Sequence, residues 1–375
     1  MRSFGLSNSS SRWLIVPLLA VLWAFQGFAQ TGKLPAGASA KIDDAVAHFI
    51  GETKTPGVAV AVVEDGEFAW ASGYGMADLE NSVPVTQETL FRLASISKPI
   101  GAVAAMELWE QGKLDLDAPI QKYCPAFPDK GAVITTRELL GHLGGIRDYR
   151  DGAAGESEVN NTKHFADPIA GGLSFFKDDP LVAAPGSHYN YSTQGYTLVG
   201  CAIDAVSNEP YADFVRQNVL VPAGMTVTQV DDRFAVISHR TRFYSKDATG
   251  KVINAELLDS SYKIPGGGWL SSAGDIARFE AALLNGKLVK PSTLTLMGTP
   301  LKPTDGLEDH YGLGLSAGTL DGVEFLSHGG SQHGTSTMML FVPSRGVGVV
   351  VLANMDHVGA SDLAKEIVSI LLASK

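Results

Sequence analysis

Apolar stretches with the composition of β-strands lie near both ends of the chain, and this placement constrains the fold more than any other feature. Near the N-terminus, residues 57–63 are valine, alanine and glycine, and the turn signal Asp65-Gly66 leads into a partner strand at 67–74. Near the C-terminus we predict three further strands, at residues 323–327, 335–342 and 346–353. The simplest assembly is one antiparallel sheet that both ends of the chain build together.

Helical patterns fill most of the remaining sequence. The amphipathic segments 41–52 and 360–372 are predicted to be helices that cover the sheet, and helices are also expected at 95–111 and 275–284. Residues 144–190 are rich in Gly, Asp, Asn and Pro, which indicates a long surface excursion that could border a site. The predicted fold class is therefore α+β: an antiparallel sheet covered by helices, with an inserted, mostly helical lobe.

The composition is that of a folded, acidic protein. The 375 residues are 45% hydrophobic and 18% charged, which excludes a chain that is disordered throughout. The net charge is -11, and the sequence contains no basic run and no alternation of Lys or Arg with aromatic residues. We therefore expect no nucleic-acid partner.

The first thirty residues have the layout of a secretory signal peptide. Arg2 and Arg12 precede the apolar run 13–25, and small residues follow up to Ala29. A membrane anchor is the alternative interpretation, but the run is short for a bilayer span and Pro17 interrupts it. Cleavage after Ala29 is the interpretation that we prefer.

This interpretation divides the chain into a signal peptide, 1–29, and one folded domain, 30–375. It predicts a periplasmic or secreted protein with no stable membrane anchor after cleavage, and it leaves the oligomeric state open. Export would permit a disulfide between Cys124 and Cys201, while two buried thiols are the alternative. No Cys/His cluster has zinc-like spacing, so we expect no metal and no cofactor.

The most suggestive chemical motif is the tetrad Ser95-Ile96-Ser97-Lys98. A serine is a weak nucleophile until a base takes its proton, and residues three apart on a helix face each other. Pro99 fits only near a first helical turn, which places Ser95 at the start of an apolar helix. In that setting Lys98 would be desolvated and able to act as a base.

The spacing alone is weak evidence. It recurs at 174–177 and at 260–263, but neither of these tetrads is followed by an apolar helix. Context therefore selects Ser95, with a plain helix-capping serine beside a solvated Lys98 as the alternative.

The second motif is Tyr191-Ser192-Thr193, which precedes a predicted helix at 195–206. Positive charge lowers the pKa of a tyrosine, so Tyr191 could ionise or relay a proton if a lysine lay nearby. A structural tyrosine with an ordinary hydrogen-bond partner is the alternative.

The third motif is His328-Gly329-Gly330-Ser331, at the end of a predicted strand. Glycines let another backbone approach closely, so this strand edge could offer its N–H groups to an acyl substrate. The N–H groups of Ser331 and Ser95 would together form an oxyanion hole. A glycine bulge or turn is the alternative.

Taken together, the three motifs resemble the serine beta-lactamase-related family, which contains class C beta-lactamases, serine DD-carboxypeptidases, D-aminopeptidases and beta-lactamase-like esterases. The resemblance implies a beta-lactamase/transpeptidase-like fold and extends over nearly all of the chain after residue 29. The matching stretches are residues 73–78, 91–98, 112–117, 139–146, 311–315 and 328–330.

The resemblance also implies roles for individual residues. Ser95 would be the nucleophile that is acylated, and Lys98 would activate it. Tyr191 would carry the proton to the leaving group and activate the hydrolytic water. The amide of Ser331 would share the oxyanion hole with Ser95.

Two positions depart from the family pattern. Thr193 stands where lactamases carry an Asn that contacts the acyl side-chain amide, and His328 stands where many relatives carry a Lys that holds a substrate carboxylate. Thr193, His328, Gly329 and Gly330 are nevertheless the predicted substrate-binding residues. We expect acyl transfer, with poor recognition of lactams and weak fixed recognition of carboxylates.

Three functional hypotheses follow. The first is an exported serine hydrolase that forms an acyl-enzyme at Ser95 with a beta-lactam, a D-amino-acid peptide or a small ester. The second, which the changes at Thr193 and His328 suggest, is a binding or regulatory protein that keeps the fold without turnover. The third is a scaffold or filament-forming protein, because Tyr-Ser-Thr and Gly-Ile-Arg-Asp-Tyr at 145–149 are similar to a mitochondrial beta-lactamase-like branch.

Overall fold

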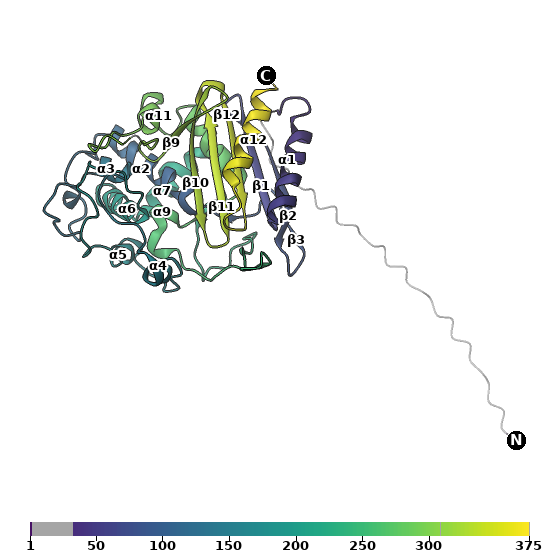
Figure 1. Ribbon diagram of the computed structural model, residues 1–375, viewed down its shortest axis with the longest axis horizontal. Coiled ribbons are helices and arrows are strands. Elements are labelled where there is room, and N and C mark those ends of the chain that lie inside the picture. The colour runs from purple at the N-terminus through teal and green to yellow at the C-terminus, as the bar shows by residue number, and fades with distance from the viewer. Residues whose placement is uncertain (2–32, 308, 375) are drawn as a thin grey trace.

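The protein consists of a sheet with helices on both of its faces and a helical lobe to one side (Figure 1). This computed structural model describes Met1 and residues 33–307 and 309–374. The predicted signal peptide, apart from Met1, lies outside the described residues.

Both ends of the chain build the main sheet, as the sequence predicts. It has seven strands in the order β3-β2-β1-β12-β11-β10-β9, and every neighbouring pair is antiparallel. The strands are β1 (Gly57–Glu64), β2 (Glu67–Asp78), β3 (Val83–Pro84), β9 (Ser316–Leu320), β10 (Val323–Gln332), β11 (Thr335–Val342) and β12 (Val347–Ala353). β10 is longer than predicted, so the His328 motif lies within the strand rather than at its end.

The central strands are buried on both faces, which explains their continuous apolar sequences. In β1, Val60 and Val62 face one helical layer while Ala59 and Ala61 face the other. This alternation is the two-residue period of a strand. The β1–β2 turn has positive φ at Asp65 (52°) and Gly66 (78°), the combination that a tight right-twisted hairpin requires.

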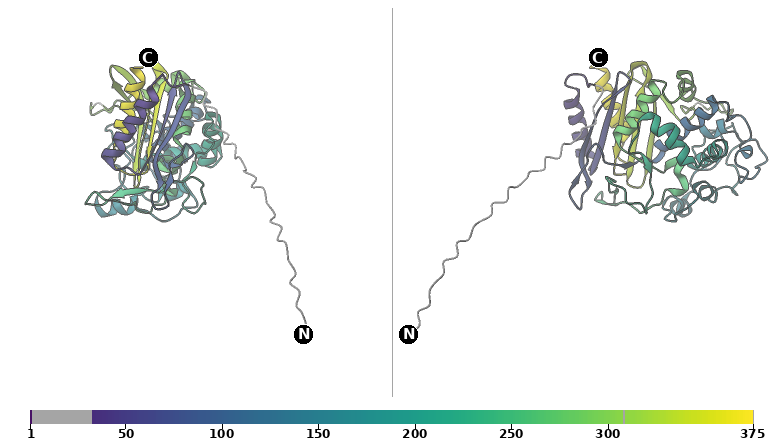
Figure 2. Two further views of the ribbon diagram at one scale, coloured as in Figure 1. Left: turned by 90° about the vertical axis from the view of Figure 1, so that its right-hand side faces the viewer. Right: turned by 180° about the vertical axis from the view of Figure 1, so that it is seen from behind.

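Helices from the two ends of the chain cover one face of the sheet. α1 (Ala38–Thr53) packs beside α12 (Ala360–Leu372), and both bury apolar residues against β1, β11 and β12 (Figures 1 and 2). α10 (Ala273–Leu284) covers the opposite face. These positions confirm the predicted terminal and central helices to within a few residues.

The segment between β3 and β9 supplies the lobe and two small sheets. Its helical elements are η1 (Ala94–Ile96), α2 (Ser97–Glu110), η2 (Ile120–Lys122), α3 (Thr136–Leu140), α4 (Gly152–Val159), α5 (Pro168–Leu173), α6 (Thr193–Ser207), α7 (Tyr211–Val215), η3 (Arg216–Leu220), α8 (Val221–Ala223), η4 (Ser261–Lys263), α9 (Ile264–Gly267), α10 and α11 (Pro291–Gly298). The short strands are β4 (Phe91–Arg92), β5 (Gln229–Val230), β6 (Tyr244–Lys246), β7 (Val252–Asn254) and β8 (Trp269–Ser271), and the turn η5 (Pro343–Arg345) joins β11 to β12. Within the described part of the chain, no helix combines the length and apolarity that a bilayer span requires.

Cys124 and Cys201 form a disulfide, which resolves the alternative that the sequence leaves open. The bond joins the loop after η2 to the middle of α6 across 77 residues of sequence. It therefore ties the helix that follows Tyr191 to the loop after η2.

We expect the double variant Cys124→Ala/Cys201→Ala to fold with a lower free energy of unfolding. A closed loop of this length restricts the unfolded chain, and its loss costs about 2–5 kcal/mol. Urea unfolding of the oxidised wild type and the variant measures the difference. Dithiothreitol should destabilise the wild type and leave the variant unchanged; equal stability of the oxidised proteins would contradict this prediction.

Candidate active site

Ser95 lies where strand β10 meets the start of the helical lobe. It is partly exposed in the short turn η1, and α2 begins two residues later. The preceding residue, Ala94, has a φ of 47°, a left-handed conformation that is uncommon for a residue with a side chain. Backbone strain of this kind is concentrated at functional sites. Here it occurs at the first residue of the turn that presents the Ser95 hydroxyl.

The Lys98 amine is buried and points at Ser95. Its Nζ lies 3.0 Å from Ser95 Oγ, 3.3 Å from Thr193 Oγ1 and 2.9 Å from the carbonyl oxygen of Gly266. The side chain is 0% exposed, which rules out the solvated lysine of the alternative interpretation. Burial lowers the pKa of this amine to about 7, with Asp148 opposing the shift and the charge of Lys263 adding to it.

These contacts orient the amine when it is neutral. A carbonyl oxygen only accepts hydrogen bonds, so one N–H points at Gly266, and the second N–H points at Thr193 Oγ1. The remaining lone pair then faces the Ser95 hydroxyl. This is the geometry that a base needs to take the serine proton.

Tyr191 lies over the same amine. Lys98 Nζ is 4.6 Å from the centre of the Tyr191 ring, and α6 starts two residues after the tyrosine, capped by Ser192. Burial raises the pKa of Tyr191, and a side-chain hydrogen bond with Ser95 acts against that shift. The phenol is therefore neutral at pH 7 and able to pass a proton on without ionising.

The His142 ring packs against the Tyr191 ring. Its Nδ1 accepts a hydrogen bond from the Ser192 N–H at 3.1 Å, and its ring centre lies 4.2 Å from that of Tyr191. Burial lowers its pKa well below the usual range, so the ring is neutral. The sequence motif 139–146 contains His142, but the sequence analysis assigns it no role.

Asp148 fixes the start of α6. Its Oδ1 accepts the backbone N–H of Thr193 at 2.8 Å. It belongs to the predicted surface excursion, which ion pairs from Arg147 to Glu158 and Asp179 hold together. Through Asp148 the excursion therefore borders the site.

The glycine motif brings β10 against the turn that holds Ser95. A Cβ built on Gly330 would lie 2.3 Å from the carbonyl oxygen of Leu93 and 3.1 Å from the Ser95 backbone nitrogen, so only glycine fits there. Thr337 of β11 secures this contact by donating to the same Leu93 carbonyl at 2.9 Å. Gly329 and Ser331, on either side of Gly330, are exposed.

β10 also has a free edge at this point. β9 pairs with it only as far as Ser327, so the edge from His328 onward has no partner strand in the described sheet. Because the N–H groups of a strand alternate between its two edges, those of this segment that point away from β11 have no partner strand there and are available to a substrate carbonyl beside the Ser95 N–H.

His328 is engaged within the protein. Its Nδ1 lies 2.6 Å from the carbonyl oxygen of Gly329, so Nδ1 carries the proton and Nε2 accepts a 2.8 Å hydrogen bond from the Tyr311 hydroxyl. Burial and the charge of Lys98 lower the His328 pKa to about 3. At neutral pH this residue is an uncharged support for Tyr311 and offers no cation to a carboxylate.

Two hollows meet at the predicted catalytic residues. One, of about 300 Å³, extends from Ser95 towards Asp148, Thr193 and Lys263. The other, of about 480 Å³, extends along β10 past His328. Ser95, Tyr191 and Ser331 line both, so a substrate bound over Ser95 can occupy either side.

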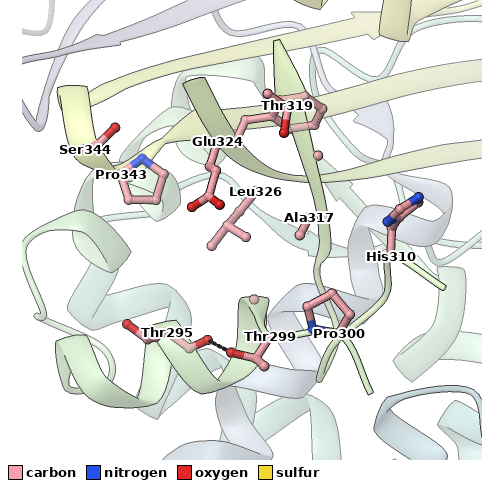
Figure 3. Close-up of a pocket in the computed structure, with 13 residues that line it drawn as sticks. Thr295, Thr299, Pro300, His310, Ala317, Thr319, Glu324, Leu326, Pro343 and Ser344 are labelled. Atoms are coloured by element: carbon pink, nitrogen blue, oxygen red, sulfur yellow. Dashed lines mark hydrogen bonds between the residues drawn. The ribbon is translucent and has the colours of Figure 1, made fainter. Parts of the chain in front are cut away.

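A larger hollow of about 620 Å³ lies elsewhere, between α11 and the strands β9 and β10 (Figure 3). Glu324 and Thr319 point into it, and the Thr299 hydroxyl donates to the Thr295 carbonyl on its wall at 2.7 Å. It shares no lining residue with the two hollows at Ser95. The chemistry of the side chains, rather than the size of the cavity, therefore locates the candidate site.

Comparison with known proteins identifies the family of this chain. Residues 42–372 match the protein family described as Beta-lactamase. The chain belongs to the beta-lactamase family. As a member of this family of serine hydrolases, it is a serine hydrolase, and its α+β fold is the one that the sequence predicts.

Individual relatives differ in what their names state. The human serine beta-lactamase-like protein LACTB, mitochondrial, is 31% identical over 419 residues, covering 84% of this chain and 76% of the relative. An octameric penicillin-binding protein homologue from Pyrococcus abyssi has a TM-score of 0.78 at 26% identity, over 89% of this chain and 77% of that one. D-amino acid amidase from Ochrobactrum anthropi SV3, solved with L-phenylalanine amide, has a TM-score of 0.76 at 25% identity, over 89% and 99%.

Every predicted site residue of this beta-lactamase family member lies in one region, which also contains Lys263, a residue that the three motifs do not include. The tetrad 260–263 is not followed by an apolar helix, because Pro265 and three glycines come after it. The segment Ile264–Gly267 forms α9, which turns the chain so that the Gly266 carbonyl contacts Lys98 and Lys263 lines the cleft. The repeated Ser-x-x-Lys spacing was the available signal.

Proposed function

We propose that this serine hydrolase forms an acyl-enzyme at Ser95 and hydrolyses small esters and amides, including amides and peptides of D-amino acids. The observation that carries the proposal is the buried Lys98 amine, 3.0 Å from Ser95 Oγ, with its other contacts directed at acceptors. Tyr191 and the free edge of β10 supply the remaining groups that acyl transfer requires.

In the acylation step, Ser95 Oγ attacks the carbonyl carbon of the substrate while its proton moves to Lys98 Nζ. The N–H groups of Ser95 and Ser331 hold the resulting oxyanion. The proton then passes from Lys98 through the Tyr191 hydroxyl to the leaving group as the bond to that group breaks. Because the pKa of Tyr191 is raised, the phenol relays the proton, and Lys98 is the resting base.

Deacylation reverses these transfers. Water gives a proton to Lys98 through Tyr191 and attacks the ester carbon. The Ser95 oxygen leaves, recovers the proton and releases the acid. No step requires a group beyond those of the chain and water.

The substrate class rests on the departures at two positions. Neutral His328 offers no fixed positive charge beside β10, and the Thr193 hydroxyl is occupied by Lys98. Both features favour substrates that need neither a cation at position 328 nor a side-chain amide at position 193. They argue against efficient turnover of beta-lactams.

A comparison of three chromogenic substrates tests the proposal. We expect the highest kcat/KM on p-nitrophenyl butyrate, a lower value on a D-Ala-D-Ala peptide and the lowest on a chromogenic cephalosporin. Ser95→Ala should abolish turnover of all three. Absence of turnover in the wild type, with measurable binding, would favour the binding-only hypothesis.

The rate should depend on pH through Lys98. The neutral amine is the reactive form, and its pKa is lowered to about 7, so it is scarce below this value and dominant above it. We expect kcat/KM for p-nitrophenyl butyrate to rise roughly tenfold per pH unit below pH 7 and to level off above about pH 8. A profile that is flat from pH 5 to 8 would contradict the assignment of Lys98 as the base.

We also propose that the mature protein is exported after cleavage following Ala29. The charged and apolar pattern of residues 1–29 and the Cys124–Cys201 disulfide support this proposal, because disulfides persist in oxidising compartments. Intact-mass analysis of the protein recovered from its native cells should give a chain that begins at Gln30. A chain that retains residues 1–29 would contradict it.

A further inference from the structure

Lys263 is a buried lysine in the wall of the cleft. It is the last residue of η4 and is 3% exposed. It lines the 300 Å³ hollow together with Ser95 and Asp148. Its amine lies 5.9 Å from the ring centre of Tyr149 and 5.5 Å from that of Tyr262. An amine held between aromatic rings at the edge of a cleft is oriented without being neutralised.

The carboxylates near Lys263 are committed to other groups. Asp231 pairs with Arg92 at 2.8 Å and with Arg240 at 3.3 Å. Asp148 accepts the Thr193 N–H. Among the described residues, no carboxylate lies within 4.0 Å of the Lys263 amine and no hydrogen bond from it is formed.

A buried lysine without an ion-pair or hydrogen-bond partner is costly to a folded protein, because its charge is removed from water and only more distant carboxylates compensate it. Burial and the charge of Arg92 lower the Lys263 pKa to about 8, while Asp231 and Asp148 oppose the shift, so the amine is mostly charged at pH 7. The cleft therefore presents a positive charge that an anionic ligand would satisfy.

We propose that Lys263 binds a carboxylate of the substrate and makes the enzyme prefer anionic esters and amides over neutral ones. This inference rests on the proposed function, since the carboxylate is part of a substrate acylated at Ser95. The site is on the Thr193 side of the nucleophile, opposite the hollow in which His328 is neutral. Lys263 is thus a specificity-determining residue.

Lys263 also influences Lys98, and the experiment must separate the two effects. The charge of Lys263 lowers the pKa of Lys98, so its removal changes the rate with every substrate. The preference for an anion is the ratio of the kcat/KM values for an anionic and a neutral ester, measured on one protein at one pH. A change in the pKa of Lys98 affects both values equally and therefore does not change their ratio.

The experiment compares Lys263→Met with the wild type on three esters at pH 7. p-Nitrophenyl butyrate is neutral, mono-p-nitrophenyl glutarate carries a carboxylate on the acyl side, and 3-carboxy-4-nitrophenyl butyrate carries one on the leaving group. Met keeps the volume and the apolar stem, so the variant should fold, and circular dichroism checks that it does. Lys290→Met, which removes an exposed lysine, is the matched control.

We expect Lys263→Met to lower the ratio of anionic to neutral kcat/KM by about tenfold to a hundredfold for one of the two anionic esters, mainly through KM. The affected ester identifies which half of the substrate lies beside Lys263. Lys263→Arg should retain most of the ratio, and Lys290→Met should not change it. An unchanged ratio for both anionic esters in Lys263→Met would overturn the inference, while hydrolysis of the neutral ester that depends on Ser95 would leave the proposed function intact.

Discussion

Lys98→Met should lower kcat for p-nitrophenyl butyrate by about a hundredfold to ten-thousandfold, the range that a positioned general base contributes. Lys98 Nζ contacts Ser95 Oγ, and its contacts with Thr193 and Gly266 leave its lone pair free to take the serine proton. Met fills the same buried space without that lone pair. Residual hydrolysis should also lose the rising limb near pH 7, because the group that titrates there is gone.

Lys113→Met provides the control for this prediction. Lys113 is exposed and follows the other end of α2, so its removal should leave kcat and the pH profile unchanged. A Lys98→Met protein as fast as the wild type would exclude Lys98 as the base and would require a different activator for Ser95.

Gly330→Ala should remove most of the activity and also destabilise the fold. The added Cβ would lie 2.3 Å from the Leu93 carbonyl oxygen and 2.4 Å from Thr337 Oγ1, so β10 must move away from the turn that holds Ser95. Overpacking of this kind costs about 1–3 kcal/mol, and misplacement of an oxyanion-hole donor lowers kcat by about a hundredfold to a thousandfold. Urea unfolding and steady-state kinetics measure the two effects.

The neighbouring glycine is the matched control for stability. A Cβ on Gly329 would meet only Met338 Sδ at 3.6 Å and the Thr337 carbonyl at 3.7 Å, both ordinary contacts. Gly329→Ala should therefore change the free energy of unfolding by less than about 0.5 kcal/mol. If Gly330→Ala matches the wild type in both stability and rate, the close approach of β10 to Ser95 is not needed for function.

Local patterns in the sequence were sufficient to predict much of this fold. Hydrophobic periodicity and turn chemistry are local properties of a sequence. They therefore predict, to within a few residues, the strand at 57–63, the turn at Asp65-Gly66 and the helix at 360–372. The three-residue spacing of Ser95 and Lys98 likewise predicts their contact because one helical turn sets it.

Other features depend on contacts between distant segments and could not be predicted in this way. Lys263 lines the cleft because α9, which follows it, contacts Lys98 through the Gly266 carbonyl. The sequence near residue 263 does not predict this contact. The neutrality of His328 depends on its burial and on the charge of Lys98, which lies far away in sequence. The disulfide is evident only from the proximity of Cys124 and Cys201 in the fold, because two cysteines far apart in sequence do not imply a bond.

Covalent labelling tests the central claim most directly. The purified protein is treated with a fluorophosphonate, and intact-mass analysis compares the wild type with Ser95→Ala. We predict one added phosphonyl group on the wild type, located at Ser95 by peptide mapping, and none on Ser95→Ala. Equal labelling of the two proteins, or no labelling of a folded wild type, would contradict a Ser95 nucleophile activated by Lys98.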